Sequence, residues 1–580
     1  MFSILKQFKQ REWWLMAMLL GFVVLEVWCT LKIPEYTINL TSEVASGNIT
    51  LISVISNGGM MLLFALLCLV CTVCSVFICA KIASIISFRL REQIYNQVSK
   101  FSNVEMQKFS IASLITRSTN DVSQLQMFFT MGIYILLKAP IMSIWAICKI
   151  SITSVEWTLA TAICVTCIIA IVLVILFICL PKFKKMQTLI DNVNNVTREN
   201  VSGIRVVHAF NAENFQTNKF EKVNEDLTKT QLFTIKNLSV LMPVITFFIN
   251  ILTLSIYWIG AVLVNNAATA ERAMVIGNMT AFTQYALMIA MSFIFLVVVF
   301  IMLPRAIVSA KRINAVLNQS VSICDGAIQF SNGEGKIEFH NVTYKIENTN
   351  FKILNNVNFS IDKGETVAII GATGAGKTTL VELIPRLLDV SSGEVIVDGV
   401  NVKDYALSTL NSKIALANQK AILFKGTVAD NIAYGVPAGQ IDQKKMKNAL
   451  TLACADFVND LQNGVNSPVA QGGTNFSGGQ KQRLSIARAI FKDAEIIIFD
   501  DSFSALDYKT DLQIRQNIKK ALPNKTIIIV AQRIGTIKHA DKIIVLDNGE
   551  VVGIGTHKEL LSSCPIYNEI ALSQLSKEEL

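Results

Sequence analysis

The stretch that decides the fold of the second half of the chain is Val367-Ala-Ile-Ile370 followed by Gly371-Ala-Thr-Gly-Ala-Gly-Lys377-Thr378. The apolar run predicts a buried strand, and the apolar stretch that begins at Leu380 predicts a helix. A glycine-rich loop between a strand and a helix lets backbone N–H groups surround phosphate groups, and the helix N-terminus favours an anion. We therefore predict a phosphate-binding loop here.

Individual side chains of this loop have separate expected roles. The Lys377 ammonium is expected to reach the β- and γ-phosphates of a nucleotide, and the Thr378 hydroxyl is expected to ligate Mg²⁺. ATP and Mg²⁺ are thus the expected ligands. The nucleotide-binding residues predicted in and beside the loop are Gly371, Thr373, Gly374, Ala375, Gly376, Lys377, Thr378 and Thr379.

Two later motifs complete a predicted ATP site. The run Ile496-Ile-Ile-Phe-Asp500-Asp501 is an apolar strand that ends in a carboxylate suited to Mg²⁺, with a second carboxylate where a general base is expected. The run Phe476-Ser-Gly-Gly-Gln480 opens another helix and forms a second anion site. We expect it to lie on the far side of the domain from the phosphate loop, so that only a second, head-to-tail domain brings the two together.

In these motifs the chain resembles the ATP-binding cassette (ABC) ATPases, whose signature is Leu-Ser-Gly-Gly-Gln. The resemblance implies that Tyr344 stacks on adenine and that Gln419 and Asp500 join Thr378 at the metal. It also implies that the loop from Ser504 to Asp507 crosses between two ATPase domains. The signature residues that it assigns to a partner's site are Ser477, Gly478, Gly479 and Gln480.

The sequence departs from the family pattern at two catalytic positions. Asp501 stands where these ATPases normally have Glu, and Gln532 stands where they usually have His. The shorter side chain withdraws the carboxylate, and a misplacement near 1 Å can cost on the order of 10²-fold in rate. Gln532 can donate a hydrogen bond but carries no titratable charge. With Lys377 these residues form the predicted catalytic set.

Both changes together resemble the degenerate-site subunit of heterodimeric bacterial multidrug exporters. That resemblance implies slow hydrolysis at this chain's own site and a non-identical partner half-transporter that carries the Glu base and the His. A conservative Asp base in an ordinary homodimer is the alternative interpretation.

The first half of the chain has the composition of a membrane domain. The whole chain is 52% hydrophobic and 16% charged, and its net charge of +9 is not gathered into a nucleic-acid-binding face. Lysines and arginines instead flank apolar runs. Six such runs are long enough to cross a bilayer, which takes about 20 apolar residues each: 13–33, 52–80, 129–150, 158–180, 238–264 and 279–303.

The charge distribution predicts the orientation of these spans. Segments 35–50 and 151–156 contain no Lys or Arg, whereas the segments between spans two and three and between spans four and five are rich in both. We therefore expect both termini to be cytoplasmic. The resemblance to compact bacterial half-transporters implies that the chain lies in a bacterial cell membrane. The interpretation is an all-α, six-helix, type I exporter-like transmembrane domain (1–317), a linker (318–335) and an α/β P-loop ABC ATPase domain (336–580).

Two long intracellular segments are expected to form helical hairpins. Their tips, near 109–121 and 203–210, carry apolar side chains such as Leu114 and Phe210. Apolar groups at a tip are costly in water, which favours docking onto the ATPase domain over a solvated end.

The transported substrate is the least determined part of the prediction. An ionisable residue inside a span is a candidate functional group, which singles out Glu26 as either a ligand for cationic drugs or a hydrogen-bonding partner of a neighbouring helix. Gln284 is the second candidate in the cavity. Export of amphipathic drugs, flipping of a lipid or glycolipid, and a regulatory ATP-binding subunit with little turnover of its own are the three functions compatible with the sequence.

Overall fold

The structure is a computed structural model that describes residues 8–47, 49–152, 154–268, 271–330, 335–346 and 351–574. It divides into two compact units. The first contains residues 1–99 and 111–319, and the second contains residues 100–110 and 320–580. The first seven residues and residues 331–334 of the predicted linker lie outside the described part.

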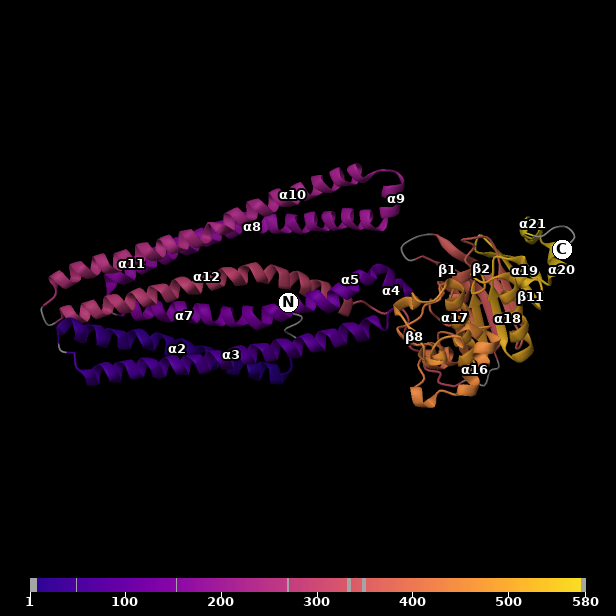
Figure 1. The fold of residues 1–580 in the computed structure, drawn as a ribbon, viewed down its shortest axis with the longest axis horizontal. Coiled ribbons are helices and arrows are strands. Elements are labelled where there is room, and N and C mark those ends of the chain that lie inside the picture. The colour runs from indigo at the N-terminus through magenta and orange to yellow at the C-terminus, as the bar shows by residue number, and fades with distance from the viewer. Residues whose placement is uncertain are drawn as a thin grey trace. The chain divides into compact units, whose positions relative to one another are not determined.

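The first unit is built from long helices, which Figure 1 shows running side by side. Six of them are long and apolar enough to cross a membrane, so the predicted six-span architecture is confirmed. The helices are α2 (Gln10–Ser46), α3 (Leu51–Val98), the continuous stretch Ile111–Ser151, α8 (Val155–Ser202), α10 and α11 (Glu213–Ser239 and Leu241–Asn266) and α12 (Arg272–Leu317).

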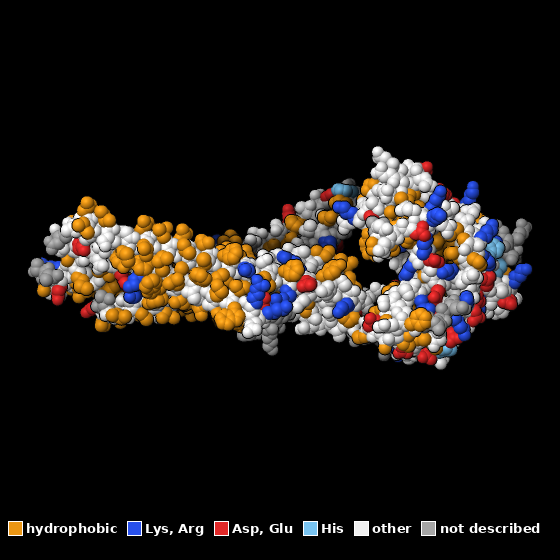
Figure 2. All heavy atoms as spheres, turned by 90° about the horizontal axis from the view of Figure 1, so that it is seen from below, with side chains coloured by type: hydrophobic (Ala, Val, Ile, Leu, Met, Phe, Trp, Pro, Cys, Tyr) orange, Lys and Arg blue, Asp and Glu red, His pale blue; other side chains and the backbone are white. Residues whose placement is uncertain are grey.

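Two groups of helices share α12. Helices α2, α3 and α7 (Ile133–Ser151) pack together and against α12, while α8, α10 and α11 form a second set in which α11 also contacts α12. Val27, Leu252 and Tyr285 belong to a core that joins the two groups. Apolar side chains such as those of Leu66 and Phe77 remain exposed over the helices, and Figure 2 shows them gathered over a long stretch of surface. A lipid bilayer accommodates such a surface.

The third span is the least regular. It begins with α5 (Ile111–Thr116) and α6 (Val122–Met127), and two π-helical turns interrupt it at Arg117–Asp121 and Phe128–Gly132. Within the predicted hairpin tip 109–121, Leu114 and Asp121 are buried in the helical unit, whereas Ile111 and Ile115 are exposed. The short helix α4 (Asn103–Lys108) precedes this span. Helix α9 (Ile204–Ala209) separates α8 from α10, within the other predicted tip.

Helix α4 clusters with the second unit rather than with the helices on either side of it in the chain. Val104 packs against the core that also contains Val342 and Leu380. Ser102 caps the helix, and the Glu105 carboxylate accepts hydrogen bonds from the Ser102 and Ser322 N–H groups at 2.7 and 3.1 Å. The residues of α4 are thus tied to the chain that enters the second unit.

The second unit contains a six-stranded sheet of order β12-β11-β3-β10-β9-β6. All neighbouring strands are parallel except β11 and β12, and the two faces of the sheet carry separate apolar cores. The strands are β3 (Thr366–Ile370), β6 (Ile414–Ala417), β9 (Ile496–Asp500), β10 (Thr526–Val530), β11 (Lys542–Asp547) and β12 (Glu550–Gly555).

A second, antiparallel sheet has the order β2-β1-β4-β5, and a short ribbon pairs β7 with β8. The strands are β1 (Ile337–Lys345), β2 (Lys352–Ile361), β4 (Ser392–Val397), β5 (Val400–Asn401), β7 (Gly426–Thr427) and β8 (Pro468–Val469). The helices of the unit are α13 (Lys377–Leu383), α14 (Leu407–Lys413), α15 (Val428–Ile432), α16 (Gln443–Leu452), α17 (Gly478–Lys492), α18 (Tyr508–Ala521), α19 (Ile534–Ile537), α20 (His557–Ser563) and α21 (Pro565–Gln574).

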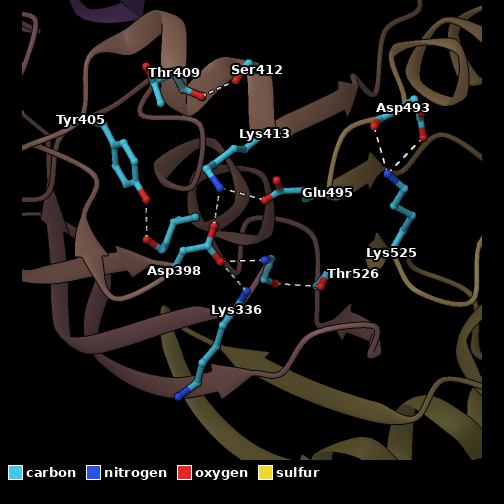
Figure 3. A network of polar contacts seen from close by, with 12 residues as sticks. Lys336, Asp398, Tyr405, Thr409, Ser412, Lys413, Asp493, Glu495, Lys525 and Thr526 are labelled. Atoms are coloured by element: carbon cyan, nitrogen blue, oxygen red, sulfur yellow. Dashed lines mark hydrogen bonds and ion pairs between the residues drawn. The ribbon is translucent and has the colours of Figure 1, made fainter. Parts of the chain in front are cut away.

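A buried ionic network holds the point where the chain enters these sheets (Figure 3). The Asp398 carboxylate accepts the N–H of Gly335 at 2.7 Å and of Lys336 at 3.0 Å, and it pairs with the Lys413 ammonium at 2.8 Å. Lys413 also pairs with Glu495 at 2.9 Å. The network joins the start of β1 to the residue before β9, so its role is to fix the fold.

Candidate nucleotide site

The phosphate loop lies between β3 and α13, as the sequence predicts for a strand–loop–helix motif. Gly374 and Gly376 have φ values of +88° and +95°, a region of backbone conformation in which only glycine is unstrained. A Cβ on Gly371 would lie 2.0 Å from the Leu546 carbonyl oxygen. These three glycines are required by the course of the backbone. Thr373 and Thr378 are exposed at the loop, whereas Ala375 is buried beneath it.

The Lys377 side chain lies across its own loop. Its ammonium donates to the carbonyl oxygens of Gly371 and Ala372 at 2.7 and 2.8 Å. Burial lowers the pKa of Lys377, although the nearby carboxylates of Asp500 and Asp501 oppose that shift. A buried ammonium that binds carbonyl oxygens, beside the N–H groups of a glycine-rich loop, fits phosphate oxygens. The residues present therefore suit ATP.

The predicted metal ligands come together at the end of β9. The Thr378 hydroxyl donates to Asp500 Oδ1 at 3.3 Å, and the Asp500 side chain is almost fully buried. Burial raises the pKa of Asp500, and the adjacent Asp501 adds to that effect, while Thr378 and Lys377 oppose it. A hydroxyl and a carboxylate beside a phosphate site are hard oxygen donors that fit Mg²⁺, which usually completes its coordination with phosphates and water.

Asp501 and Gln532, two of the residues predicted to be catalytic, contact each other. Asp501 Oδ2 accepts one hydrogen bond from Gln419 Nε2 at 3.1 Å and another from Gln532 Nε2 at 3.3 Å. Asp501 has a φ of +46°, and its N–H donates to the Val530 carbonyl oxygen at 3.0 Å. The carboxylate therefore stands at the junction of β9 and β10, held by two amides. A cavity of about 310 Å³ opens beside it, with Ser504 and Gln532 in its wall.

Two further glutamines position this cluster, and the sequence reasoning missed both. Gln574 Nε2 donates to the Gln532 carbonyl oxygen at 2.7 Å, and Gln574 Oε1 accepts the Ile534 N–H at 2.8 Å. Gln482 Nε2 donates to the Gln419 carbonyl oxygen at 3.3 Å. No motif marks either residue, because each acts on backbone that is distant in sequence.

The signature residues form an exposed helix start. Ser477 caps α17: its hydroxyl accepts the Gln480 N–H at 3.3 Å, and the Gln480 side chain accepts the Ser477 N–H at 2.9 Å. Ser477 and Gly478 are exposed. Within the described part of the chain, no side chain of the set Ser477, Gly478, Gly479 and Gln480 hydrogen-bonds the phosphate loop, so the chain by itself does not bring the two anion sites together.

The remaining predicted residues of the ATPase unit lie near these groups. Tyr344 is half-buried on β1 and packs against the same core as Ala375. Thr379 lies in the first turn of α13. The Ser504 hydroxyl donates to the Asp501 carbonyl oxygen at 2.8 Å, and Asp507 caps α18 through the Thr510 N–H at 2.9 Å.

The candidate cavity residues of the membrane unit are not brought together by any contact among the described residues. Gln284 is half-buried on α12. Glu26 is fully buried, and its Oε1 accepts hydrogen bonds from the Lys138 ammonium at 2.6 Å and the Tyr134 hydroxyl at 2.7 Å. Glu26 therefore contacts a neighbouring helix, as one of its two interpretations expects. The sequence reasoning missed Lys138, although a scan of the third span for charges finds it.

Comparison with known proteins gives the same assignment for both halves. The family described as ABC transporter transmembrane region matches residues 16–293, and the family described as ABC transporter matches residues 354–504. A solved structure titled as a bacterial Atm1-family ABC exporter with ATP bound superposes with a TM-score of 0.81 at 20% identity, covering 97% of this chain and 98% of that one. That likeness establishes the fold.

Curated relatives extend over the same length. An uncharacterized ABC transporter ATP-binding protein of Mycobacterium tuberculosis is 35% identical over 97% of this chain and 96% of its own. An ATP-dependent lipid A-core flippase of Hahella chejuensis is 28% identical over 87% of this chain and 85% of its own. With an ATPase unit, six candidate spans and relatives that match both, this chain belongs to the ABC transporter family and has the exporter fold.

Proposed function

We propose that this chain is one subunit of a heterodimeric ABC exporter and carries the degenerate ATP site of the pair. The observation that carries the proposal is the contact of Asp501 with Gln419 and Gln532. A general base must hold the attacking water within about 2.6–3.2 Å. Here the carboxylate is one carbon shorter than Glu, and one of its oxygens already accepts two amide N–H groups. Hydrolysis at this site is therefore slow.

Binding of ATP does not depend on those two residues. When bound, Mg²⁺ would neutralise phosphate charge beside Thr378, Asp500 and Gln419. Lys377 exchanges the carbonyl oxygens of Gly371 and Ala372 for phosphate oxygens, and Tyr344 offers a ring to adenine. The site is thus equipped to hold nucleotide and poorly equipped to cleave it.

The exposed signature supports the second part of the proposal. Ser477 and Gly478 are free to complete the phosphate loop of a second subunit, since their own phosphate loop lies elsewhere in the same unit. That partner is a non-identical half-transporter with a Glu base and a His. ATP binding closes the two ATPase units, and hydrolysis at the partner's site resets them.

The pair exports amphipathic compounds from a bacterial cell, with both termini of this chain cytoplasmic. Lysines and arginines clustered between spans two and three and between spans four and five support the orientation. Flipping of a lipid is the second candidate, favoured by the relative named as a lipid A-core flippase. A regulatory subunit with little turnover of its own is the third.

The experiment is to co-purify the partner with a tagged copy of this chain and to measure phosphate release from the pair and from this chain alone. We expect the chain alone to be slower by on the order of 10²-fold, the penalty of a displaced base. A rate for the chain alone that equals the rate of the pair would contradict the proposal. Lys377→Ala in the isolated chain is the control for contaminating ATPases.

A further inference from the structure

The predicted spans contain more positive than negative charge. Within 13–33 and 129–150 the only acidic residue is Glu26, whereas the basic residues are Lys32, Lys138 and Lys149, and the other four predicted spans contain no Asp, Glu, Lys or Arg. Glu35 lies two residues after the end of the first span. The structure places all five of these side chains on α2 and α7.

The pair of Glu26 and Lys138 has no net charge, and its carboxylate is buried. Glu26 binds Lys138 at 2.6 Å, and none of its side chain is exposed, whereas 27% of the Lys138 side chain is. A cationic ligand therefore has no accessible carboxylate here. This pair accounts for one lysine and leaves Lys32, Glu35 and Lys149 as a second group.

In that second group, two ammonium groups share one carboxylate. Lys32 Nζ lies 2.6 Å from Glu35 Oε2, and Lys149 Nζ lies 2.5 Å from Glu35 Oε1. The three side chains are 30%, 36% and 28% exposed in the order Lys32, Lys149 and Glu35. The three side chains together carry a formal charge of +1, and the two ammonium groups attract a further anion.

The second group, formed by Lys32, Glu35 and Lys149, lies near the outer limit of the membrane. Trp13 and Trp14 are exposed at the start of α2, as tryptophans of an interfacial belt are. At 1.5 Å per residue, Lys32 is about 29 Å further along the helix, close to the thickness of the hydrocarbon core. This is the depth at which the charged head of a lipid-like molecule lies.

An aromatic surface adjoins the ammonium of Lys32. Lys32 Nζ is 6.0 Å from the centre of the Trp28 ring, and 37% of Trp28 is exposed. Phe64 of α3 packs edge-on against Trp28 with ring centres 5.5 Å apart and stacks on Tyr36 at 5.6 Å. Trp28, Lys32 and Tyr36 are four residues apart on α2, so they share one face of the helix.

We propose that Lys32 and Lys149 bind the anionic head group of an amphiphile whose apolar tail lies along Trp28. Lysine is well suited to a phosphate or carboxylate oxygen because it presents a mobile point charge with three N–H donors. Glu35 holds the two ammonium groups together in the absence of the ligand. This inference rests on the proposed export function and names an anionic amphiphile as the substrate class.

The test uses the purified pair in phosphatidylcholine nanodiscs without ATP, so that it does not depend on which ATP site is active. The probe is dodecyl phosphate with a bromine at the end of its tail. Its binding is followed as quenching of the Trp28 fluorescence, which is the emission that the Trp28→Phe variant lacks. We expect saturable quenching by this probe and affinity at least about tenfold lower for the trimethylammonium analogue. Inorganic phosphate should displace the probe only weakly, because it has no tail.

Three variants test the lysines. Lys32→Gln/Lys149→Gln should weaken binding by at least about tenfold, and Lys32→Arg/Lys149→Arg should largely retain it. Lys81→Gln, at an exposed lysine of α3, is the matched control and should leave binding unchanged. Equal binding of the cationic analogue by the wild-type pair would overturn the inference even if the double Gln variant failed to fold. Unchanged binding by a folded double Gln variant would also overturn it, as would full displacement by inorganic phosphate.

Discussion

The Gln532 amide donates a hydrogen bond to the Asp501 carboxylate, with 3.3 Å between Nε2 and Oδ2. The two predicted catalytic positions at which this chain departs from the family pattern are therefore in contact, and a change at one alters the surroundings of the other. Gln419 binds the same carboxylate oxygen at 3.1 Å. The two substitutions thus act as one unit, and their effects on hydrolysis are expected to be non-additive.

The first prediction concerns restoring the base and the His together. In a Ser477→Arg background, the partner's site lacks its signature, so the remaining phosphate release reports this chain's own site. Asp501→Glu/Gln532→His should raise that rate by on the order of 10²-fold, and more than the product of the two single changes. Phosphate release from the co-purified pair measures it. Asp460→Glu, at an exposed position, is the matched control, and a double variant no faster than its parent would contradict the prediction.

The second prediction concerns the asymmetry of the pair. Ser477→Arg or Gly478→Asp should abolish most ATP hydrolysis by the complex, because a bulky or acidic group at the N-terminus of α17 blocks the anion site offered to the partner. Asp501→Asn should reduce hydrolysis only modestly, since the proposed function assigns little turnover to that site. The measurement is phosphate release at saturating ATP. Equal losses from both classes of variant would mean that the two sites are equivalent.

The third prediction concerns Glu105 and pH. Burial alone would raise the pKa of this carboxyl, but hydrogen bonds from Ser102 and Ser322 outweigh it, so the pKa is lowered. The stabilisation is then complete above the ordinary carboxyl pKa and is lost as pH falls through the lowered value. Glu105→Gln should cost about 1–3 kcal/mol of local stability at neutral pH and remove that acid-side pH dependence.

Hydrogen exchange of residues 100–110, measured across the acidic range, checks the behaviour of Glu105. The wild-type segment should open more readily as the pH falls, whereas the Gln variant should open to the same extent throughout. Glu92→Gln on α3, whose side chain is exposed, is the control. A segment whose protection does not change with pH in the wild type would show that Glu105 does not hold α4 in place.

The fold could be predicted because its signals are local. Four apolar residues before Gly371 and the apolar run before Asp500 became the parallel strands β3 and β9, and six apolar runs became six long helices. Pairings between distant residues could not be predicted in this way. The Lys138 partner of Glu26 and the Gln574 partner of Gln532 depend on tertiary packing that no spacing in the sequence encodes.

The start of helix α4 shows the same limit. The apolar content near Leu114 suggested a docking tip, but apolar residues serve equally well to bury a helix against its neighbours. The better local signal was polar: Ser102 followed three residues later by Glu105 is a capping box, which marks the start of a new helix at α4.

The last prediction concerns the buried pair of Asp398 and Lys413. The Asp398 side chain is not exposed at all, and Lys413 is its only charged partner among the described residues (Figure 3). Lys413→Met would leave that carboxylate uncompensated, which costs about 3–5 kcal/mol when one member of a buried pair is removed. The full-length protein should therefore unfold at a markedly lower temperature. Asp398→Asn/Lys413→Met should recover part of the loss, because the amide still accepts a backbone N–H and carries no charge.

Lys525→Met breaks the more exposed pair with Asp493 and should cost at most about 1 kcal/mol. Thermal unfolding of the four proteins side by side provides the measurement, and equal effects of Lys413→Met and Lys525→Met would refute the role assigned to burial.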